Sequence, residues 1–351
     1  MRSILALVLL AWVANTPAQQ APARASSAIT LAPMLVHGEQ PGPGLWKVTS
    51  PQGHVLWVLG TLDPLPKDMQ WQSREVLAHL AQSQELLRPP GLQLHAQLGF
   101  FGSLALLPRL IGIRNNPDGA RLADIVPPAT YARWLALKAR YIGHDRKVEK
   151  WRPLFAGFHL YEAAIKRAGL DNKQLDAMLL DAARKQGLPR TATAYVVKVE
   201  DPKALVKDFK TERLDDLACF GAMLDRVDID LAHMSTRANA WATGDLATLR
   251  AIAPGSATVP CADAVSGAGF ARRLGLKDIP GKLRQAWLVQ ARRALAANSA
   301  TFALLPIDEA LRADGYLAAL KADGDVIVAP DADDEPSDED IAPAAAASAR
   351  R

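Results

Sequence analysis

Long apolar runs, cysteines and basic clusters are scarce in this chain of 351 residues, and each scarcity excludes a class of protein. Two cysteines exclude a small disulfide-rich scaffold, and a single strongly apolar run, at the N-terminus, excludes a membrane protein with several spans. No run of lysines and arginines is interleaved with aromatic residues, so we expect no binding to nucleic acid. The hydrophobic fraction of 49% and the charged fraction of 22% are typical of a globular protein.

The first residues have the pattern of a signal peptide. Arg2 precedes an apolar stretch of 11 residues, Ile4 to Ala14, which is too short to cross a bilayer as a helix. Small residues at 16–18 and 21–23 then offer two cleavage sites. We therefore expect residues 1–23 to be a signal peptide, and the mature chain to be periplasmic or secreted, with no integral membrane span. An uncleaved anchor or a buried helix is the alternative.

Low-complexity segments flank the body of the chain. Residues 19–43 are rich in Ala, Pro, Gln and Ser, whereas residues 329–351 contain seven acidic residues and almost no large apolar side chain. Such a tail cannot bury enough apolar surface to offset the entropy of ordering. We expect a flexible lead-in at 24–43, a folded domain at 44–328 and a disordered acidic tail at 329–351.

The two cysteines, Cys219 and Cys261, invite a disulfide prediction, because thiols in an exported chain are usually oxidised. The bond requires Cα atoms within about 7 Å of each other. Two unpaired, buried thiols are the alternative. A zinc site is disfavoured because no histidine lies near either cysteine in the sequence.

Strand patterns occur near both ends of the body, with helical patterns between them. Two apolar runs, 45–48 and 55–59, flank a Pro- and Gly-containing turn, as in a hairpin. Two more strands are expected at 301–305 and 325–328, and a short buried helix, broken by Pro108, at 103–113. Further helices are expected at 73–87, 127–142, 153–168, 175–187, 201–209, 212–228, 235–250 and 283–297. The predicted class is α/β: one sheet built from N- and C-terminal strand–loop–helix units, covered by helices, with a helical middle region.

Several short motifs occur in a fixed order along the body, and together they resemble the TraB/GumN family. The resemblance extends over residues 44–328, and the family that the chain resembles is related to the TIKI proteases. The matching segments are Leu45–Val48, Leu59–Leu62, Leu65–Lys67, Trp71–Ser73, Gly169–Asp171, Trp241–Leu246, Leu283–Trp287 and Asp314–Leu317.

The resemblance implies a metal-dependent hydrolase in which two Gly-x-x-His loops and an acidic residue hold a divalent metal. This chain departs from that pattern at every metal position. Asp63 replaces the first histidine, Glu309 replaces the second, and the expected glutamate falls near Arg88. Carboxylates in place of imidazoles shift the preference from zinc towards harder cations such as Mg²⁺, Ca²⁺ or Mn²⁺.

Two functions follow as alternatives from these substitutions. In the first, the metal site is degenerate, no cofactor is bound, and the protein has a binding or accessory role in the cell envelope towards an unknown peptide or envelope ligand. In the second, Asp63 and Glu309 hold a divalent metal and the protein is a peptidase-like hydrolase. The candidate catalytic residues are Asp63, Glu309 and Arg284. We expect Asp63 and Glu309 at one edge of the sheet, with Arg284 close enough to neutralise part of their charge.

Overall fold

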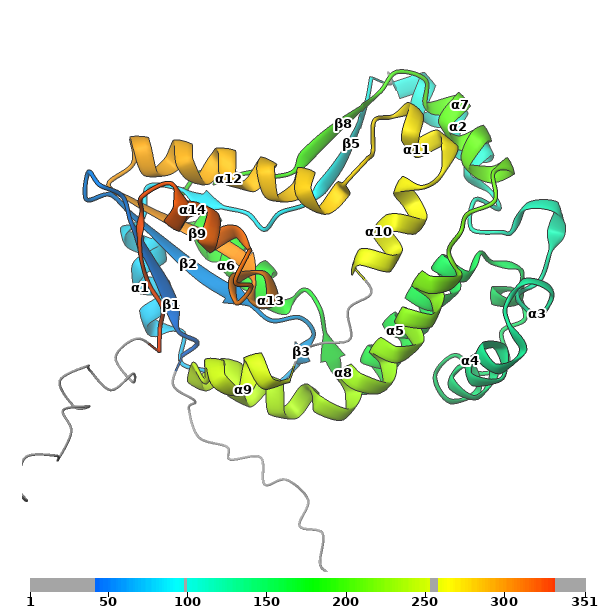
Figure 1. The fold of residues 1–351 in the computed structure, drawn as a ribbon, viewed down its shortest axis with the longest axis horizontal. Helices are drawn as coiled ribbons and strands as arrows, with labels where there is room; N and C mark the ends of the chain where they lie inside the picture. Colours follow the sequence, from blue (N-terminus) through cyan, green and yellow to red (C-terminus); the bar gives the residue numbers. More distant parts are fainter. Residues whose placement is uncertain (1–41, 98–99, 253–257, 332–351) are drawn as a thin grey trace, which may run out of the picture. The chain divides into compact units, whose positions relative to one another are not determined.

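The computed structural model describes residues 42–97, 100–252 and 258–331 (Figure 1). The expected signal peptide and nearly all of the expected lead-in and acidic tail lie outside the described residues. Within them the protein is a mixed α/β structure, as predicted. No helix in these three ranges combines the length and apolar character needed to cross a bilayer.

A six-stranded mixed sheet forms the centre of the fold, in the order β10-β1-β2-β9-β4-β7. The strands β1, β2 and β10 are antiparallel neighbours, whereas β2, β9, β4 and β7 run parallel. The N- and C-terminal strands therefore share one sheet, as expected. The strands are β1 Leu45–Thr49, β2 Val55–Thr61, β4 Leu86–Leu87, β7 Arg190–Thr191, β9 Ala300–Pro306 and β10 Val326–Val328.

The predicted hairpin between β1 and β2 is confirmed. The amide of Gly53 donates to the carbonyl of Ser50 at 2.8 Å, and Gly53 has a φ of 83°. A side chain is strained in that left-handed conformation, so glycine at this position sets the turn.

Helices cover both faces of the sheet, because the side chains of Phe302 to Leu305 in β9 are all fully buried. The helices α12 (Ile279–Ala297) and α14 (Tyr316–Ala322) pack against one another, and α12 also packs against β2 and β9. The Trp287 indole of α12 donates to the carbonyl of Leu304 at 3.3 Å. The helices α1 (Arg74–Gln82) and α6 (Gln174–Lys185) form a second contacting pair.

A long helix, α8 (Leu217–Thr243), joins the sheet to a second helical core. It packs along α5 (Pro153–Arg167), where a Cβ on Gly157 would lie 2.9 Å from the Met223 Cβ. The disulfide Cys219–Cys261 ties α8 to α10 (Thr258–Ser266), with Cα atoms 4.5 Å apart, so the disulfide prediction is confirmed. The sequence predicted two helices, at 212–228 and 235–250. The structure has one long helix and then α9 (Leu246–Ala251), which begins after Gly244.

A separate pair of parallel strands, β5 (Leu92–Ala96) and β8 (Tyr195–Val199), was not predicted. Near it, α2 (Phe100–Leu110) packs against α7 (Pro202–Thr211). The prediction of a short buried helix broken at Pro108 was wrong: α2 is continuous through Pro108, and its leucines Leu104 and Leu107 are 55% and 57% exposed. These side chains face solvent because α7 covers only part of the helix.

The remaining elements are short, or lie outside the sheet. They are α3 Leu122–Ile125, α4 Pro128–Tyr141, α11 Gly269–Arg273, α13 Ile307–Ala310 and the two-stranded pair β3 Leu65–Pro66 and β6 Leu170–Asp171.

Candidate functional site at the strand ends

The loops after β2 and β9 leave the sheet at the same edge. The two strands are parallel and in register, with Thr61 opposite Pro306. Asp63 and Asp308 each lie two residues beyond this last pair, so the register places them at equal distances from the strand ends. The carboxyl ends of parallel strands are the usual location of ligand sites in α/β sheets.

The end of β2 is fixed by close packing around Gly60. A Cβ at this position would lie 2.3 Å from the Cδ1 of Ile307 and 2.9 Å from the Trp46 ring, so only glycine fits. The Trp241 indole of α8 donates to the Gly60 carbonyl at 2.7 Å. Helix α8 is thereby held against the edge of the sheet at which Asp63 emerges.

Asp63 is a carboxyl group with an unsatisfied buried oxygen. Its Oδ1 has no hydrogen-bond partner among the described residues. Burial, and then the negative charges of Asp176 and Asp171, raise the pKa of Asp63 from 3.8 to about 7, against the opposing charge of Arg226. A carboxyl group of this kind is partly protonated at neutral pH, so it can both donate and accept a hydrogen bond.

The neighbouring Asp176 belongs to α6 and shares these properties. Its Oδ1 is also buried without a partner among the residues described. Burial raises the pKa of Asp176 above its ordinary value, and Arg88, just beyond β4, opposes that rise. Asp171 comes from β6, which pairs with β3 through Leu65. Asp176 and Asp171, from two separate segments, therefore both act on Asp63 at this edge.

Helix α8 brings a set of charges to the same region. Arg226 binds Asp230 at 2.9 Å, and the Tyr161 hydroxyl donates to the same carboxylate at 2.7 Å. Eleven residues after Arg226, which is about three helical turns, Arg237 binds Asp308 at 2.8 Å. The Arg237 side chain is only 3% exposed. Desolvation raises the pKa of Asp308, and the Arg237 guanidinium opposes this rise.

Elsewhere in the fold, the buried carboxylate of Glu149 is fully engaged. Glu149 accepts from Lys138 at 2.7 Å, from the Trp134 indole at 3.2 Å and from the Tyr131 hydroxyl at 3.1 Å. Such saturation is expected of a structural ion pair, because an unsatisfied buried polar atom is costly. In contrast, Asp63, Asp176 and Asp230 each have one buried oxygen without a partner among the described residues, and these oxygens identify the strand-end edge as the candidate site.

The comparisons with known proteins agree with the resemblance in the sequence. A model of the TraB/PrgY/gumN family matches residues 44–328. This chain belongs to the TraB/PrgY/gumN family. No curated protein and no solved structure matches it.

The structure distributes the three predicted site residues of this TraB/PrgY/gumN member over two clusters. Asp63 lies with the strand-end carboxyls. Glu309 forms an ion pair with Arg312 at 3.5 Å, and Arg284 donates to the Asp314 carbonyl at 2.7 Å. Glu309 and Arg284 both act on Tyr316, where burial and the Glu309 charge raise the phenol pKa and Arg284 opposes them.

Sequence reasoning missed the other charged residues of the strand-end cluster, which are Asp171, Asp176, Arg226, Asp230, Arg237 and Asp308. Asp308 has the same offset from its strand as Asp63, so strand register is the signal that could have found it. The spacing of Arg226 and Arg237 along one helix face was a second signal. Nothing in the sequence indicated that Asp176 would approach Asp63.

The divalent metal implied by the TraB/PrgY/gumN resemblance would need several carboxylate or imidazole ligands directed at one point. No group of three or more His, Cys, Asp or Glu side chains within the described ranges is placed to hold a metal ion. Instead, the carboxylates Asp230 and Asp308 are already paired with the guanidinium groups of Arg226 and Arg237.

Proposed function

We propose that this protein is an exported member of the TraB/PrgY/gumN family with a binding or accessory role in the cell envelope. In this proposal, the buried Arg237 and the partly buried Arg226 of α8 neutralise carboxylates at the strand ends in place of a divalent cation. The observation that carries the proposal is the 2.8 Å ion pair between Arg237 and Asp308, formed by an arginine that is almost fully buried.

The Asp308 carboxylate can be neutralised by the Arg237 guanidinium or by a divalent metal ion, but not by both at once. A divalent ion at the Asp308 carboxylate would lie within a few ångströms of the Arg237 guanidinium. Two like charges at such a distance repel strongly in a partly desolvated site. Because the Arg237 side chain on α8 is buried, it cannot turn into solvent to relieve that repulsion.

The carboxyl groups of Asp63 and Asp176 then provide the recognition chemistry. Each presents one unsatisfied oxygen, and a proton held at Asp63 near neutral pH adds a donor. Amide groups of a peptide, or hydroxyl groups of an envelope glycan, are the complementary partners for such a donor–acceptor pair.

Metal-dependent hydrolysis through Asp63 and Glu309 is the second candidate function. The unpaired oxygens of Asp63 and Asp176 favour it, because carboxylate oxygens are the ligands that hard cations prefer. The position of Glu309 beside Arg312 weighs against it.

Metal analysis of the purified mature chain distinguishes the two candidates. We expect far less than one equivalent of bound metal, and no shift in the melting temperature when Mg²⁺, Mn²⁺, Ca²⁺ or Zn²⁺ is added. Asp63→Ala is compared with Asp68→Ala, which removes an exposed carboxylate five residues away. A stoichiometric metal that is lost in D63A and in Glu309→Ala, but kept in D68A, would establish the hydrolase instead.

A second experiment tests the role of Arg237 directly. Arg237→Met keeps an unbranched apolar stem and removes the guanidinium, leaving Asp308 without its partner. We expect a loss of about 2 kcal/mol in the free energy of unfolding, less than for a fully buried pair, because the Asp308 charge is left without a partner at a partly exposed position. The matched control is Arg292→Met, which breaks the exposed 2.7 Å pair with Asp323 and should cost less than about 1 kcal/mol. Equal effects would remove the basis of the proposal.

Export is tested by N-terminal sequencing of the mature protein. We expect a start between Gln19 and Ser26, after the apolar stretch of the proposed signal peptide. Recovery of intact Met1 from a soluble cytosolic fraction would refute export.

A further inference from the structure

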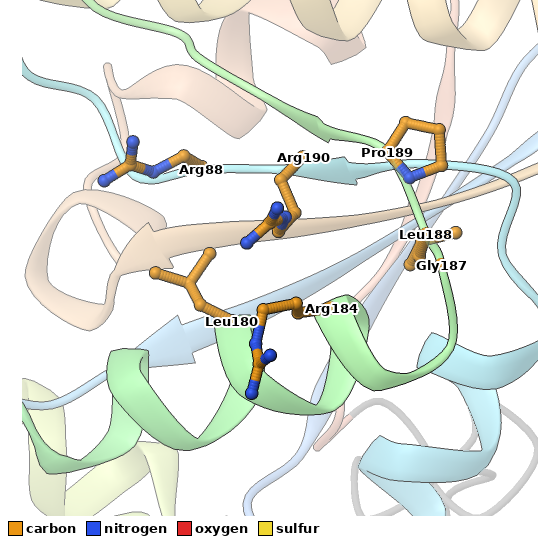
Figure 2. Close-up of a pocket in the computed structure, with 7 residues that line it drawn as sticks. All are labelled: Arg88, Leu180, Arg184, Gly187, Leu188, Pro189 and Arg190. Carbon is orange, nitrogen blue, oxygen red and sulfur yellow. The ribbon is translucent and has the colours of Figure 1, made fainter.

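A pocket lined with arginines lies between α6 and the edge of the sheet (Figure 2). Its volume is about 660 Å³, and its lining comes from α6, from the turn that follows this helix, and from the neighbouring strands β4 and β7. Three of the seven lining residues are arginines, and none is acidic. The lining residues are Arg88, Leu180, Arg184, Gly187, Leu188, Pro189 and Arg190.

Strand register explains why the arginines gather there. Arg190 of β7 lies opposite Leu86 of β4, and Arg88 follows two residues after Leu86. Side chains two apart on a strand point to the same face, so Arg88 and Arg190 share the face that α6 covers. On α6, Leu180 and Arg184 are one helical turn apart and line the opposite wall. In Figure 2 the side chain of Arg190 extends from β7 towards α6.

Two of these guanidinium groups lack an acidic partner within the described ranges. The third, Arg184, forms an ion pair with Asp181 at 2.5 Å, and both of these side chains are well exposed. Arg88 and Arg190 form no ion pair with any residue that the structure describes. Arg88 acts on Asp176, which lies one turn before Leu180 on α6, so the pocket approaches the strand-end cluster there.

We propose that this pocket binds a phosphate group, with Arg88 and Arg190 as its principal contacts. A guanidinium presents its donors in a planar fork that matches the oxygens of a phosphate, and two such forks balance the nearly two negative charges of a phosphate monoester. A carboxylate carries one charge and leaves one arginine unbalanced. The pocket is larger than a phosphate, so the rest of the ligand lies against Leu180 and Leu188.

This inference goes beyond the proposed function and does not depend on it. Arginines are not metal ligands, so phosphate binding through them needs no metal ion, although Arg88 also acts on Asp176. The distinction matters for the test, because a phosphate can also bind a protein through a bridging metal ion. Titrations in the presence of EDTA separate the two.

The test is calorimetric titration of the full mature chain with inorganic phosphate and with phenyl phosphate, at pH 7.5, low salt and with EDTA. We expect both to bind, phenyl phosphate more tightly, and acetate to bind at least tenfold more weakly. Arg88→Gln/Arg190→Gln should weaken phosphate binding at least tenfold. The control Arg74→Gln/Arg213→Gln removes the same charge from exposed positions elsewhere and should change it less than twofold.

The variant Arg88→Lys/Arg190→Lys covers the case in which the glutamine variant fails to fold. It keeps both positive charges and loses the planar pairs of guanidinium donors, so we expect an affinity for phosphate between those of the wild type and the glutamine variant. Failure of phosphate to bind, equal weakening in the R74Q/R213Q control, equal binding of acetate, or loss of binding on adding EDTA would each overturn the proposal. None of these results would alter the test of the Arg237 pair.

Discussion

The raised pKa of Asp63 predicts a specific dependence of stability on pH. The carboxyl titrates near 3.8 in the unfolded chain and near 7 in the folded protein. Below pH 3.8 it is protonated in both states, so its burial costs nothing through ionisation. As the pH rises from about 4 to 7, the unfolded chain releases the proton while the folded protein retains it, and the folded state loses stability. Above pH 7 the loss is complete.

The size of the effect follows from the difference between the two pKa values. A tenfold change in proton affinity is worth about 1.36 kcal/mol, so the rise from 3.8 to about 7 corresponds to about 4 kcal/mol in total. Between pH 5 and pH 8 the folded state should lose about 2 to 3 kcal/mol of this amount. Asp63→Asn has nearly the same shape and cannot ionise, so it should escape that loss.

Urea denaturation of the wild type and D63N, followed by tryptophan fluorescence at pH 5, 6, 7 and 8, measures the difference directly. We expect the free energy of unfolding of D63N, relative to that of the wild type, to rise steadily up to pH 7 and to stay constant above it. Asp68→Asn, at an exposed position, should follow the wild type at every pH. A difference between D63N and wild type that stays flat within about 0.5 kcal/mol would show that the Asp63 carboxyl is hydrated, and would refute the reasoning.

Two further predictions concern the helical core. Gly157→Ala should destabilise the protein by about 1–3 kcal/mol, because the new Cβ would lie 2.9 Å from that of Met223. Gly221→Ala is the control: its Cβ meets no described atom within 4 Å, so it should stabilise by about 0.5–1 kcal/mol. Thermal or urea unfolding measures both variants, and a G157A variant as stable as the wild type would contradict the close approach of α5 and α8. Reduction of Cys219–Cys261, which closes a loop of 42 residues, should cost about 3–4 kcal/mol, and an unchanged urea midpoint in reductant would contradict this.

The sequence predicted those parts of the fold whose signals are local. Continuous apolar runs identified β2 and β9, and the turn residues before Val55 identified the hairpin. The strands β4 and β7 have two residues each, too few for any alternation of side chains, and each exists only because β9 or its neighbour lies alongside. Pairing of β5 with β8 joins segments about 100 residues apart, which no local pattern records.

The candidate site was predictable only in part, for the same reason. Asp63 was found because the loop after a recognisable strand resembles the Gly-Thr-x-His loop of the family, with Asp63 at the histidine position. Its relation to Asp176 depends on how α6 packs, and the pair between Arg237 and Asp308 joins residues 71 positions apart. Local sequence patterns cannot report contacts that the tertiary fold alone creates.

The position of β9 in the sheet has a consequence for the synthesis of the chain. This strand, Ala300–Pro306, lies between β2 and β4, so without it the sheet separates into the groups β10-β1-β2 and β4-β7. A ribosome must therefore deliver about six-sevenths of the chain before the centre of the sheet can close. A nascent or prematurely terminated chain ending before Ala300 exposes the unpaired apolar edge of β2, the kind of edge that aggregates and that chaperones shield. Under the proposed export, this late closure would keep the polypeptide unfolded, and so able to cross the membrane, until nearly all of it has been made.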